Sequence, residues 1–265
     1  MSINQSIEDS VDKLLVVMKQ LRNPDTGCEW DKKQSFESIS KFTIEEAYEV
    51  VDSIDRADYG SLKEELGDLL LQVVFHSEIA SEKGLFKFKN VVEAITKKLI
   101  ERHPYVFKNK RQHTAEEQLI NWENSKLKEK RKKNHESLMD DIPLNLPSLQ
   151  RSQKIQQRVS QVGFDWDSRQ ECFKKIKEEL RELKQAMNSS DKEAIQEEIG
   201  DLLISIVNLS RHLELDAEES LRQGNLKFEK RFKFIEIELK KKNKKFSETS
   251  LREMDLLWEK AKKVL

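Results

Sequence analysis

The sequence predicts an all-α protein made of two tandem helical-bundle domains. The first indication is composition, since only 7 of the 265 residues are Gly and only 4 are Pro. Sheet proteins depend on turns rich in those residues, so their scarcity favours long helices. The second indication is the helical spacing of apolar residues, with no segment that alternates with period two. The third is an internal repeat at a constant offset of 133 residues, which indicates a duplicated helical module.

Helices account for most of the first half. The expected ranges are 7–21, 43–56, 61–83, 90–103 and 114–133. Thr43 and Ser61 are the expected N-caps of the second and third helices, because each has Glu three residues later. Gly84 should end the third helix and Pro104 the fourth. The basic run 126–133 within the last range is interpreted as a solvated face or linker, with a phosphate-binding patch as the alternative.

The second half repeats this organisation. Two of the four prolines, Pro143 and Pro147, mark a domain boundary. The predicted domains are therefore 1–135 and 148–265, joined by a linker over 136–147. The expected helices are 149–162, 168–187, 191–213, 216–242 and 250–265, with a loop at 163–166 after the first.

Each half carries two pairs of acidic residues. Glu179 and Glu182 are three residues apart, and so are Glu198 and Asp201, so each pair shares a helix face. Two such helices packed antiparallel would direct four carboxylates at one small volume. These charges repel one another unless divalent cations neutralise them. The matching residues of the first half are Glu46, Glu49, Glu65 and Asp68.

The ordinary interpretation of such acids in a charge-rich helical protein is a solvated face. Two features favour a site instead. The second pair runs directly into the apolar segment 202–207, which we expect to be buried. Gly67 and Gly200 lie inside predicted helices, where Gly costs roughly 0.5–1 kcal/mol relative to Ala. We therefore expect another helix to approach closely beside the acids.

The ligand types indicate which metal such a site would take. Carboxylates alone favour Mg²⁺, with Mn²⁺ as the alternative, whereas Zn²⁺ takes His or Cys. A di-iron bundle needs Glu three residues before His. The residues in that position before the five His are Val73, Ile100, Lys110, Lys132 and Leu209. None of them is Glu, so the di-iron interpretation fails.

A Mg²⁺–carboxylate site commonly meets phosphate, so basic residues should converge nearby. Lys227 and Arg231 share a helix face, and Lys98 and Arg102 have the same spacing in the first half. Taken alone, such pairs are also ordinary surface residues. Asn208 is polar within an apolar run and needs a hydrogen-bond partner. Trp258 is open to two interpretations, stacking on a base or packing in the core.

Together these residues resemble the MazG family of all-α nucleoside triphosphate pyrophosphohydrolases. The resemblance covers nearly the whole chain and rests on the Glu-Glu-x-x-Glu and Glu-x-x-Asp motifs. Further matching segments are Gly27–Asp31, Glu101–Pro104, Asp141–Pro143, Lys154–Gln156 and Val162–Trp166. It implies Mg²⁺-dependent cleavage of nucleoside triphosphates to monophosphate and pyrophosphate, and a homodimer in which helices of two chains complete each bundle.

The resemblance also implies roles for particular residues. The metal ligands would be Glu179, Glu182, Glu198 and Asp201, with Glu46, Glu49, Glu65 and Asp68 as a second, doubtful set. The substrate-binding residues would be Lys175, Glu178, Glu197, Asn208, Lys227, Arg231 and Trp258. Glu178 or Glu197 would accept the proton of the attacking water. The first half departs from the pattern at Phe75 and Thr96, in place of Asn208 and Asn225, so the C-terminal copy is the expected active site.

The remaining sequence features exclude several other classes. A net charge of −1 gives no global field for nucleic acid or an anionic membrane. No basic-then-apolar leader and no membrane span are expected, and the widely separated Cys28 and Cys172 fit a reduced cytoplasm. The alternative function from another class is a non-catalytic helical regulator that binds nucleotides or partner proteins. RNA binding is a less favoured function, because the basic run 126–133 is the only sequence feature that indicates it.

Overall fold

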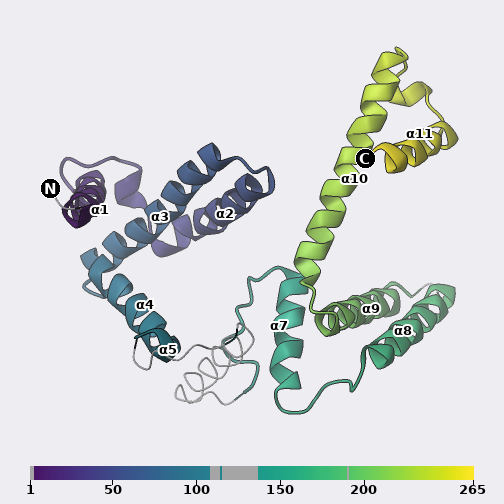
Figure 1. Cartoon of the computed structure of the whole chain (residues 1–265), viewed down its shortest axis with the longest axis horizontal. Coiled ribbons are helices and arrows are strands. Elements are labelled where there is room, and N and C mark those ends of the chain that lie inside the picture. Colours follow the sequence, from purple (N-terminus) through teal and green to yellow (C-terminus); the bar gives the residue numbers. More distant parts are fainter. Residues whose placement is uncertain (1–2, 108–113, 115–136, 190) are drawn as a thin grey trace. The chain divides into compact units, whose positions relative to one another are not determined.

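All regular elements in the described part of the chain are helices, which confirms the all-α class (Figure 1). The structure is a computed structural model, and it describes residues 3–107, 114, 137–189 and 191–265. The chain divides into an N-terminal unit, residues 1–130, and a C-terminal unit, residues 131–265. The expected helix 114–133, with the basic run, lies outside the described residues apart from Thr114. The predicted domain limits remain predictions.

The N-terminal unit is organised around a helical hairpin. Its elements are α1 (Ile3–Leu21), η1 (Asp31–Lys33), α2 (Phe36–Asp55), α3 (Tyr59–Glu82), α4 (Phe88–Arg102) and α5 (Pro104–Phe107). Helices α2 and α3 form the hairpin, and α1 and α4 pack against α3 (Figure 1). The core cluster is Met18, Ile39, Val74, Phe75 and Ile79. Burial of these side chains from α1, α2 and α3 holds the hairpin in place.

The predicted start of the second helix was wrong. Helix α2 begins at Phe36, with Ser35 as its N-cap. The Ser35 N–H donates to the Ser38 hydroxyl at 2.9 Å, and the Ser38 N–H donates to the Ser35 hydroxyl at 3.3 Å. This reciprocal pair satisfies two backbone N–H groups at the helix start, with Ser38 in the place where the capping-box pattern expects Glu. Thr43 lies inside the helix, and its hydroxyl bonds His76 Nε2 at 3.2 Å.

Two other helix starts also lie a few residues before the predicted ones. Asp58, not Ser61, is the N-cap of α3, and its carboxylate accepts the Ser61 N–H at 3.1 Å. Helix α4 begins at Phe88, and Asn90 accepts the Lys87 N–H at 3.0 Å. The predicted end of α3 is confirmed, because Gly84 follows it with φ of +68°, a conformation that favours Gly.

The C-terminal unit contains the second hairpin. Its elements are α7 (Ser148–Ser160), α8 (Arg169–Ser189), α9 (Lys192–His212), α10 (Ala217–Lys241), η2 (Phe246–Glu248) and α11 (Leu251–Val264). Helices α8 and α9 form the hairpin, α7 packs on α9, and α11 packs on α10 (Figure 1). The predicted starts at Asp191, Asp216 and Ser250 are confirmed as N-caps. No described helix is long and apolar enough to cross a membrane.

Both hairpins leave the same apolar stripe exposed. In α3, Leu66, Leu70 and Val73 are 50%, 42% and 37% exposed. The residues 133 positions later in α9, namely Ile199, Leu203 and Ile206, are 45%, 46% and 44% exposed. The prediction that 202–207 is buried was therefore wrong for most of the segment, because only Ser205 and Val207 in it are buried.

The prediction of close helix approach at the two glycines was also wrong for the described residues. A Cβ added at Gly67 or Gly200 would meet no atom within 4 Å. These glycines and the apolar stripes therefore give each hairpin an open face. Nothing in the described chain covers that face.

Acidification should weaken the packing of α11 on α10. Lys241 and Lys260 donate to Glu238 at 2.8 and 2.7 Å and lower the pKa of this carboxyl from 4.5 to about 2. A depressed pKa stabilises the fold above the unfolded value, and this contribution disappears as the pH falls through the folded value. Glu238→Gln should therefore be less stable than wild type at pH 7, with the difference shrinking between about pH 4.5 and 2.

Denaturant unfolding at several pH values measures this difference. The matched control is Glu236→Gln, which changes an exposed carboxylate on the same helix. If the difference in free energy of unfolding between Glu238→Gln and wild type did not change with pH, the ion pairs of Glu238 would contribute nothing to stability.

Candidate active site

The acids of the C-terminal unit are positioned by the turn between α8 and α9. The Asp191 side chain accepts the N–H groups of Glu193 and Ala194 at 3.0 and 3.4 Å. This cap fixes the start of α9 directly after the end of α8. Because the connection is so short, the two helices run antiparallel and their acidic pairs face each other.

Three of the four predicted metal ligands meet between these helices. Glu179, Glu182 and Glu198 each offer a carboxylate oxygen, and these atoms lie within 4.8 Å of one another. We call these three residues the C-terminal acidic cluster. Glu179 is only 4% exposed, and the other two are half-buried. Asp201 lies outside the cluster but near enough for its charge to raise the pKa of Glu198.

The cluster has the electrostatics of a cation site. Burial is the main cause that raises the pKa of Glu198, followed by the charges of Glu182 and Glu179. Like charges held in a partly dry site destabilise the ionised form. A divalent cation would relieve this repulsion, and an all-oxygen donor set suits hard cations. The residues present therefore fit Mg²⁺ or Mn²⁺.

Lys175 already balances part of this charge. Its Nζ lies 2.7 Å from Glu178 Oε1 and 2.8 Å from Glu179 Oε1. The hydrogen bond from Lys175 lowers the pKa of Glu178, and the two carboxylates raise the pKa of Lys175. The predicted neighbour Glu197 is exposed, and its charge also acts on Glu198.

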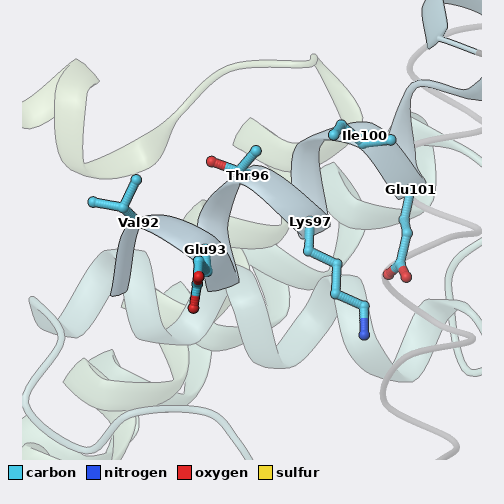
Figure 2. Close-up of a pocket in the computed structure, with 6 residues that line it drawn as sticks. All are labelled: Val92, Glu93, Thr96, Lys97, Ile100 and Glu101. Atoms are coloured by element: carbon cyan, nitrogen blue, oxygen red, sulfur yellow. The ribbon is translucent and has the colours of Figure 1, made fainter. Parts of the chain in front are cut away.

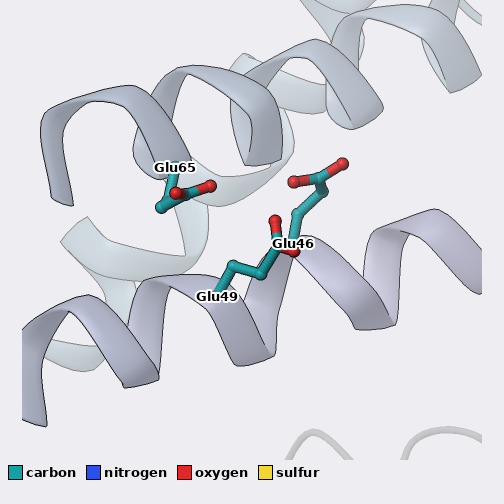
Figure 3. A group of neighbouring side chains, drawn as sticks. All are labelled: Glu46, Glu49 and Glu65. Carbon is teal, nitrogen blue, oxygen red and sulfur yellow. The ribbon is translucent and has the colours of Figure 1, made fainter. Parts of the chain in front are cut away.

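The N-terminal unit has a matching cluster without this lysine. Glu46 and Glu49 on α2 lie opposite Glu65 on α3, with oxygens within 4.8 Å of one another (Figure 3). Burial raises the pKa of Glu46 and of Glu65, and the nearby charge of Asp68 adds to both effects. The position that matches Lys175 is Phe42. No ion pair with Lys or Arg reaches these three glutamates within the described residues of this unit.

The predicted triphosphate-binding pair lies elsewhere in the C-terminal unit. Lys227 and Arg231 are on α10, and the Arg231 guanidinium lies 5.7 Å from the ring centre of Trp258 on α11. No ion pair joins either residue to the acidic cluster across the described part of the unit, and Figure 1 shows α10 leading away from the hairpin towards α11. Arg231 Nε is buried and has no hydrogen-bond partner in the part of the chain that the structure describes. Within the described residues of one chain, the basic pair therefore forms no ion pair with the acids.

Asn208 lines a pocket between α7, α9 and the loop at 163–166. The pocket has a volume of about 310 Å³ and is called here the Trp166 pocket. Its lining residues are Gln156, Val159, Gly163, Phe164, Asp165, Trp166, Ile204, Asn208 and Arg211. Asn208 Oδ1 accepts hydrogen bonds from Arg211 Nη2 and Nε at 2.8 and 3.2 Å. The expectation that Asn208 needs a partner is confirmed.

Sequence reasoning missed the charged pair behind Asn208. Arg211 forms an ion pair with Asp165, and His212 Nε2 lies 3.0 Å from the same carboxylate oxygen. Burial alone would raise the pKa of Asp165, but the hydrogen bonds from Arg211 and His212 outweigh it and lower that pKa. The available signal was the three-residue spacing of Asn208 and Arg211, which places both on one helix face.

A second hollow, of about 460 Å³, lies along α4 in the N-terminal unit (Figure 2). Its lining residues are Val92, Glu93, Thr96, Lys97, Ile100 and Glu101. Every one of these comes from a single helix. The described residues therefore enclose no ligand there. Of the two first-half positions that depart from the family pattern, Phe75 and Thr96, the hollow includes Thr96.

Comparison with known proteins places both acidic hairpins inside one domain type. The MazG nucleotide pyrophosphohydrolase domain matches residues 34–107 and 167–235. The nucleoside triphosphate pyrophosphohydrolase of Escherichia coli K12 is 42% identical over 96% of this chain and 98% of its own length. The nucleoside triphosphate pyrophosphohydrolase/pyrophosphatase MazG of Thermotoga maritima is 44% identical over 95% of each chain. A crystal structure of a mazG-related protein from Thermotoga maritima aligns with 44% of this chain and 98% of its own, with 24% identity and a TM-score of 0.38.

Proposed function

Because this chain belongs to the MazG nucleotide pyrophosphohydrolase family, we propose that it hydrolyses nucleoside triphosphates to monophosphates and pyrophosphate. The observation that carries the proposal is the C-terminal acidic cluster, which lies within a matched region of the chain. Its relatives of nearly equal length are nucleoside triphosphate pyrophosphohydrolases by name. Both ribo- and deoxyribonucleotides are candidate substrates.

The metal that we assign to the cluster is Mg²⁺, with Mn²⁺ as the alternative. The ligands would be Glu179, Glu182, Glu198 and Asp201. When bound, such a cation neutralises phosphate oxygens and makes water a stronger nucleophile. The raised pKa of Glu198 supports this assignment, because burial raises it and the negative charges of Glu182 and Glu179 add to that effect.

The protein's own groups would supply the remaining steps. Attack by water at the α-phosphorus releases pyrophosphate and requires a proton acceptor. Glu178 is already engaged by Lys175 at 2.7 Å, so exposed Glu197 is the freer of the two predicted acceptors. Lys227 and Arg231 would bind the charge that accumulates on the departing pyrophosphate.

The C-terminal copy is the one we propose to be active. It has Lys175 on the cluster and Asn208 beside an open pocket. The matching positions of the N-terminal copy are Phe42 and Phe75, and neither can bind phosphate or donate a hydrogen bond. We propose a weak or regulatory role for the N-terminal acids.

A homodimer is the assembly that the exposed surfaces favour. The apolar stripe Ile199, Leu203 and Ile206 is nearly half exposed in one chain, and such surface normally marks an interface. Gly200 beside it is open to a close approach. No ion pair joins Lys227 or Arg231 to the acidic cluster within the described residues, and this also fits a site completed by a partner. The two free cysteines fit a reducing cytoplasm, where nucleotides are abundant.

The activity should be visible as pyrophosphate release. Purified protein with Mg²⁺ and each of the common NTPs and dNTPs should yield monophosphate and pyrophosphate, measured by ion-exchange chromatography. A chelator should stop the reaction, because four carboxylates repel the anionic triphosphate chain unless a cation lies between them. Added Mg²⁺ should restore it.

Two other outcomes would contradict the proposed reaction. Orthophosphate in place of pyrophosphate would show cleavage of a different bond. Nucleotide binding with no turnover at any metal concentration would favour the non-catalytic regulator.

A further inference from the structure

We propose that a second pocket, in the N-terminal unit, binds a nucleoside monophosphate. The pocket lies between α1, α3 and the start of α4, has a volume of about 290 Å³ and is called here the Lys87 pocket. None of the three glutamates of the N-terminal acidic cluster lines it. Its volume is close to the lower end of the range of small-molecule sites, about 300–1,000 Å³. The pocket therefore suits a small nucleotide and is distinct from the acids between α2 and α3.

Lysine side chains give this pocket a positive rim. Lys19 comes from α1, and Lys87 and Lys89 come from the start of α4. Glu78 on α3 is the one acid of the lining, so three positive charges and one negative charge leave a net charge of +2. A phosphomonoester carries a charge of about −1.5 to −2 at pH 7. The charge of the rim therefore matches that of a single phosphate group.

The polar groups of the rim are available to a ligand. Lys19 and Lys87 form no ion pair within the described residues, and Lys89 has a long one, 3.7 Å, to exposed Glu93. Such an exposed pair contributes little. The Ser81 hydroxyl, which also lines the pocket, forms no hydrogen bond in the part of the chain that the structure describes. Ammonium and hydroxyl groups are the donors that phosphate oxygens accept from.

The start of α4 adds backbone donors to these side chains. Lys87 is at the N-cap position, and a lysine side chain has no acceptor with which to cap a helix. Asn90 accepts the N–H of Lys87 at 3.0 Å. No acceptor for the N–H groups of Phe88 and Lys89 is found among the described residues. Free N–H groups at a helix start attract anions, so they support the lysines in binding a phosphate.

The floor of the Lys87 pocket is apolar and fits a base. Leu15 and Phe88 pack against the buried core of the unit, which holds the floor in place. A flat heterocycle can lie against an aromatic ring on such a surface. The Glu78 carboxylate can accept hydrogen bonds from ribose hydroxyl groups. A nucleoside monophosphate thus uses the floor and the rim together, whereas orthophosphate would use the rim alone. The apolar lining residues are Leu15, Val16, Val74 and Phe88.

The C-terminal copy carries the opposite charge at this place. At an offset of 129 residues, which aligns α4 with α10, Lys87 and Lys89 correspond to Asp216 and Glu218. The Asp216 carboxylate caps α10 by accepting the Glu219 N–H at 2.8 Å. Two acids at a helix start repel a phosphate. The basic rim is therefore a departure of the N-terminal copy from the repeat.

Hydrogen bonds also fasten the matching helix start in the C-terminal copy. Gln153 on α7 accepts the Ala217 N–H at 2.9 Å, and its amide donates to the Leu215 carbonyl at 3.1 Å. No hydrogen bond joins residues 15–19 of α1 to residues 87–89 in the described chain. The start of α4 is thus left open towards α1, which makes room for the pocket.

Protection of lysines from acetylation tests the proposal. The full-length protein is acetylated with and without AMP, and mass spectrometry measures the rate at each lysine. A chelator is present, so that no metal holds the nucleotide at the acidic clusters. AMP should slow the acetylation of Lys19, Lys87 and Lys89, and it should leave Lys97, an exposed lysine further along α4, unchanged. Orthophosphate, pyrophosphate and ribose 5-phosphate, which lack a base, should need concentrations at least about 10-fold higher.

A charge reversal at the rim should remove this protection. Lys87→Glu should raise the AMP concentration that protects Lys19 and Lys89 by about 10- to 100-fold, because a charge-assisted contact becomes a repulsion. The variant should fold, since an acid suits a helix start. The matched control is Lys97→Glu, which makes the same change in charge on the same helix and should bind AMP as wild type does.

Three outcomes would overturn the proposal. The first is no protection by AMP, and the second is equal protection by AMP and by a phosphate without a base. The third is wild-type protection of Lys19 and Lys89 in Lys87→Glu. Because the assay needs no turnover, an active enzyme without protection would leave the proposed function standing. Protection in a protein that releases no pyrophosphate would support the Lys87 pocket and contradict the proposed function.

Discussion

Glu198→Gln should reduce pyrophosphate release at least about 100-fold, which is what loss of several kcal/mol of charge stabilisation implies. Glu198 lies in the C-terminal acidic cluster, with Glu179 and Glu182 within 4.8 Å. The amide keeps the volume of the side chain and removes its charge, so the cation site loses a ligand without leaving a cavity. Initial rates of pyrophosphate release at saturating Mg²⁺ measure the effect.

The same variant should be at least as stable as wild type in the absence of metal. Burial and the charges of Glu182 and Glu179 raise the pKa of Glu198, so the negative charge of this carboxylate destabilises the folded apo protein relative to the unfolded chain. Removing that charge removes the repulsion. Thermal unfolding followed by circular dichroism should show an unchanged or higher Tm without metal, and a smaller rise on addition of Mg²⁺ than wild type shows.

The matched control is Glu65→Gln, the same change 133 positions earlier in the N-terminal cluster. It should leave most of the pyrophosphate release intact, because that copy lacks the counterparts of Lys175 and Asn208. If Glu65→Gln abolished turnover and Glu198→Gln did not, the N-terminal copy would be the active one. If both abolished it, the copies would act together.

The acidic clusters could be predicted from the sequence because they depend on local geometry. A spacing of three residues places two acids on one helix face, and a short connection makes the helices antiparallel. Glu179, Glu182 and Glu198 meet for this reason. Asn208 was recognised as an anomaly for a similar reason, as a polar group in an apolar run.

The helix starts and the open faces could not be predicted in the same way. Ser35 and Ser38 cap α2 with two hydroxyl groups, whereas the prediction relies on Thr or Ser followed three residues later by Glu. Gly200 predicts close packing, yet no other described element comes within 4 Å of a Cβ added there. Apolar residues at helical spacing show that a face will be covered, but not whether the same chain or another covers it.

Lys227 and Arg231 act on the acids either of their own chain or of a partner chain. We expect that the partner chain supplies this basic pair to the acidic cluster. Both residues are on α10, a helix that leads away from the α8–α9 hairpin (Figure 1), and Arg231 Nε is buried with no hydrogen-bond partner among the described residues. Glu198→Gln and Arg231→Ala should each be nearly inactive as homodimers. Co-expression with two affinity tags gives the mixed dimer, which should recover about half of the wild-type activity, because one of its two sites is intact.

A second mixed dimer, made of two variants of the acidic cluster, is the control for this complementation. A dimer of Glu198→Gln with Glu179→Gln damages the acidic cluster of both chains, so it should stay inactive wherever the basic pair comes from. Leu203→Glu, placed on the exposed stripe of α9, should yield monomers by light scattering and lose turnover, because burying a charge at an interface is costly. A mixed dimer of Glu198→Gln with Arg231→Ala that is as inactive as its parents would show that acids and basic pair act within one chain. Recovery of activity would instead mean that the acids of one chain act together with the basic pair of the other.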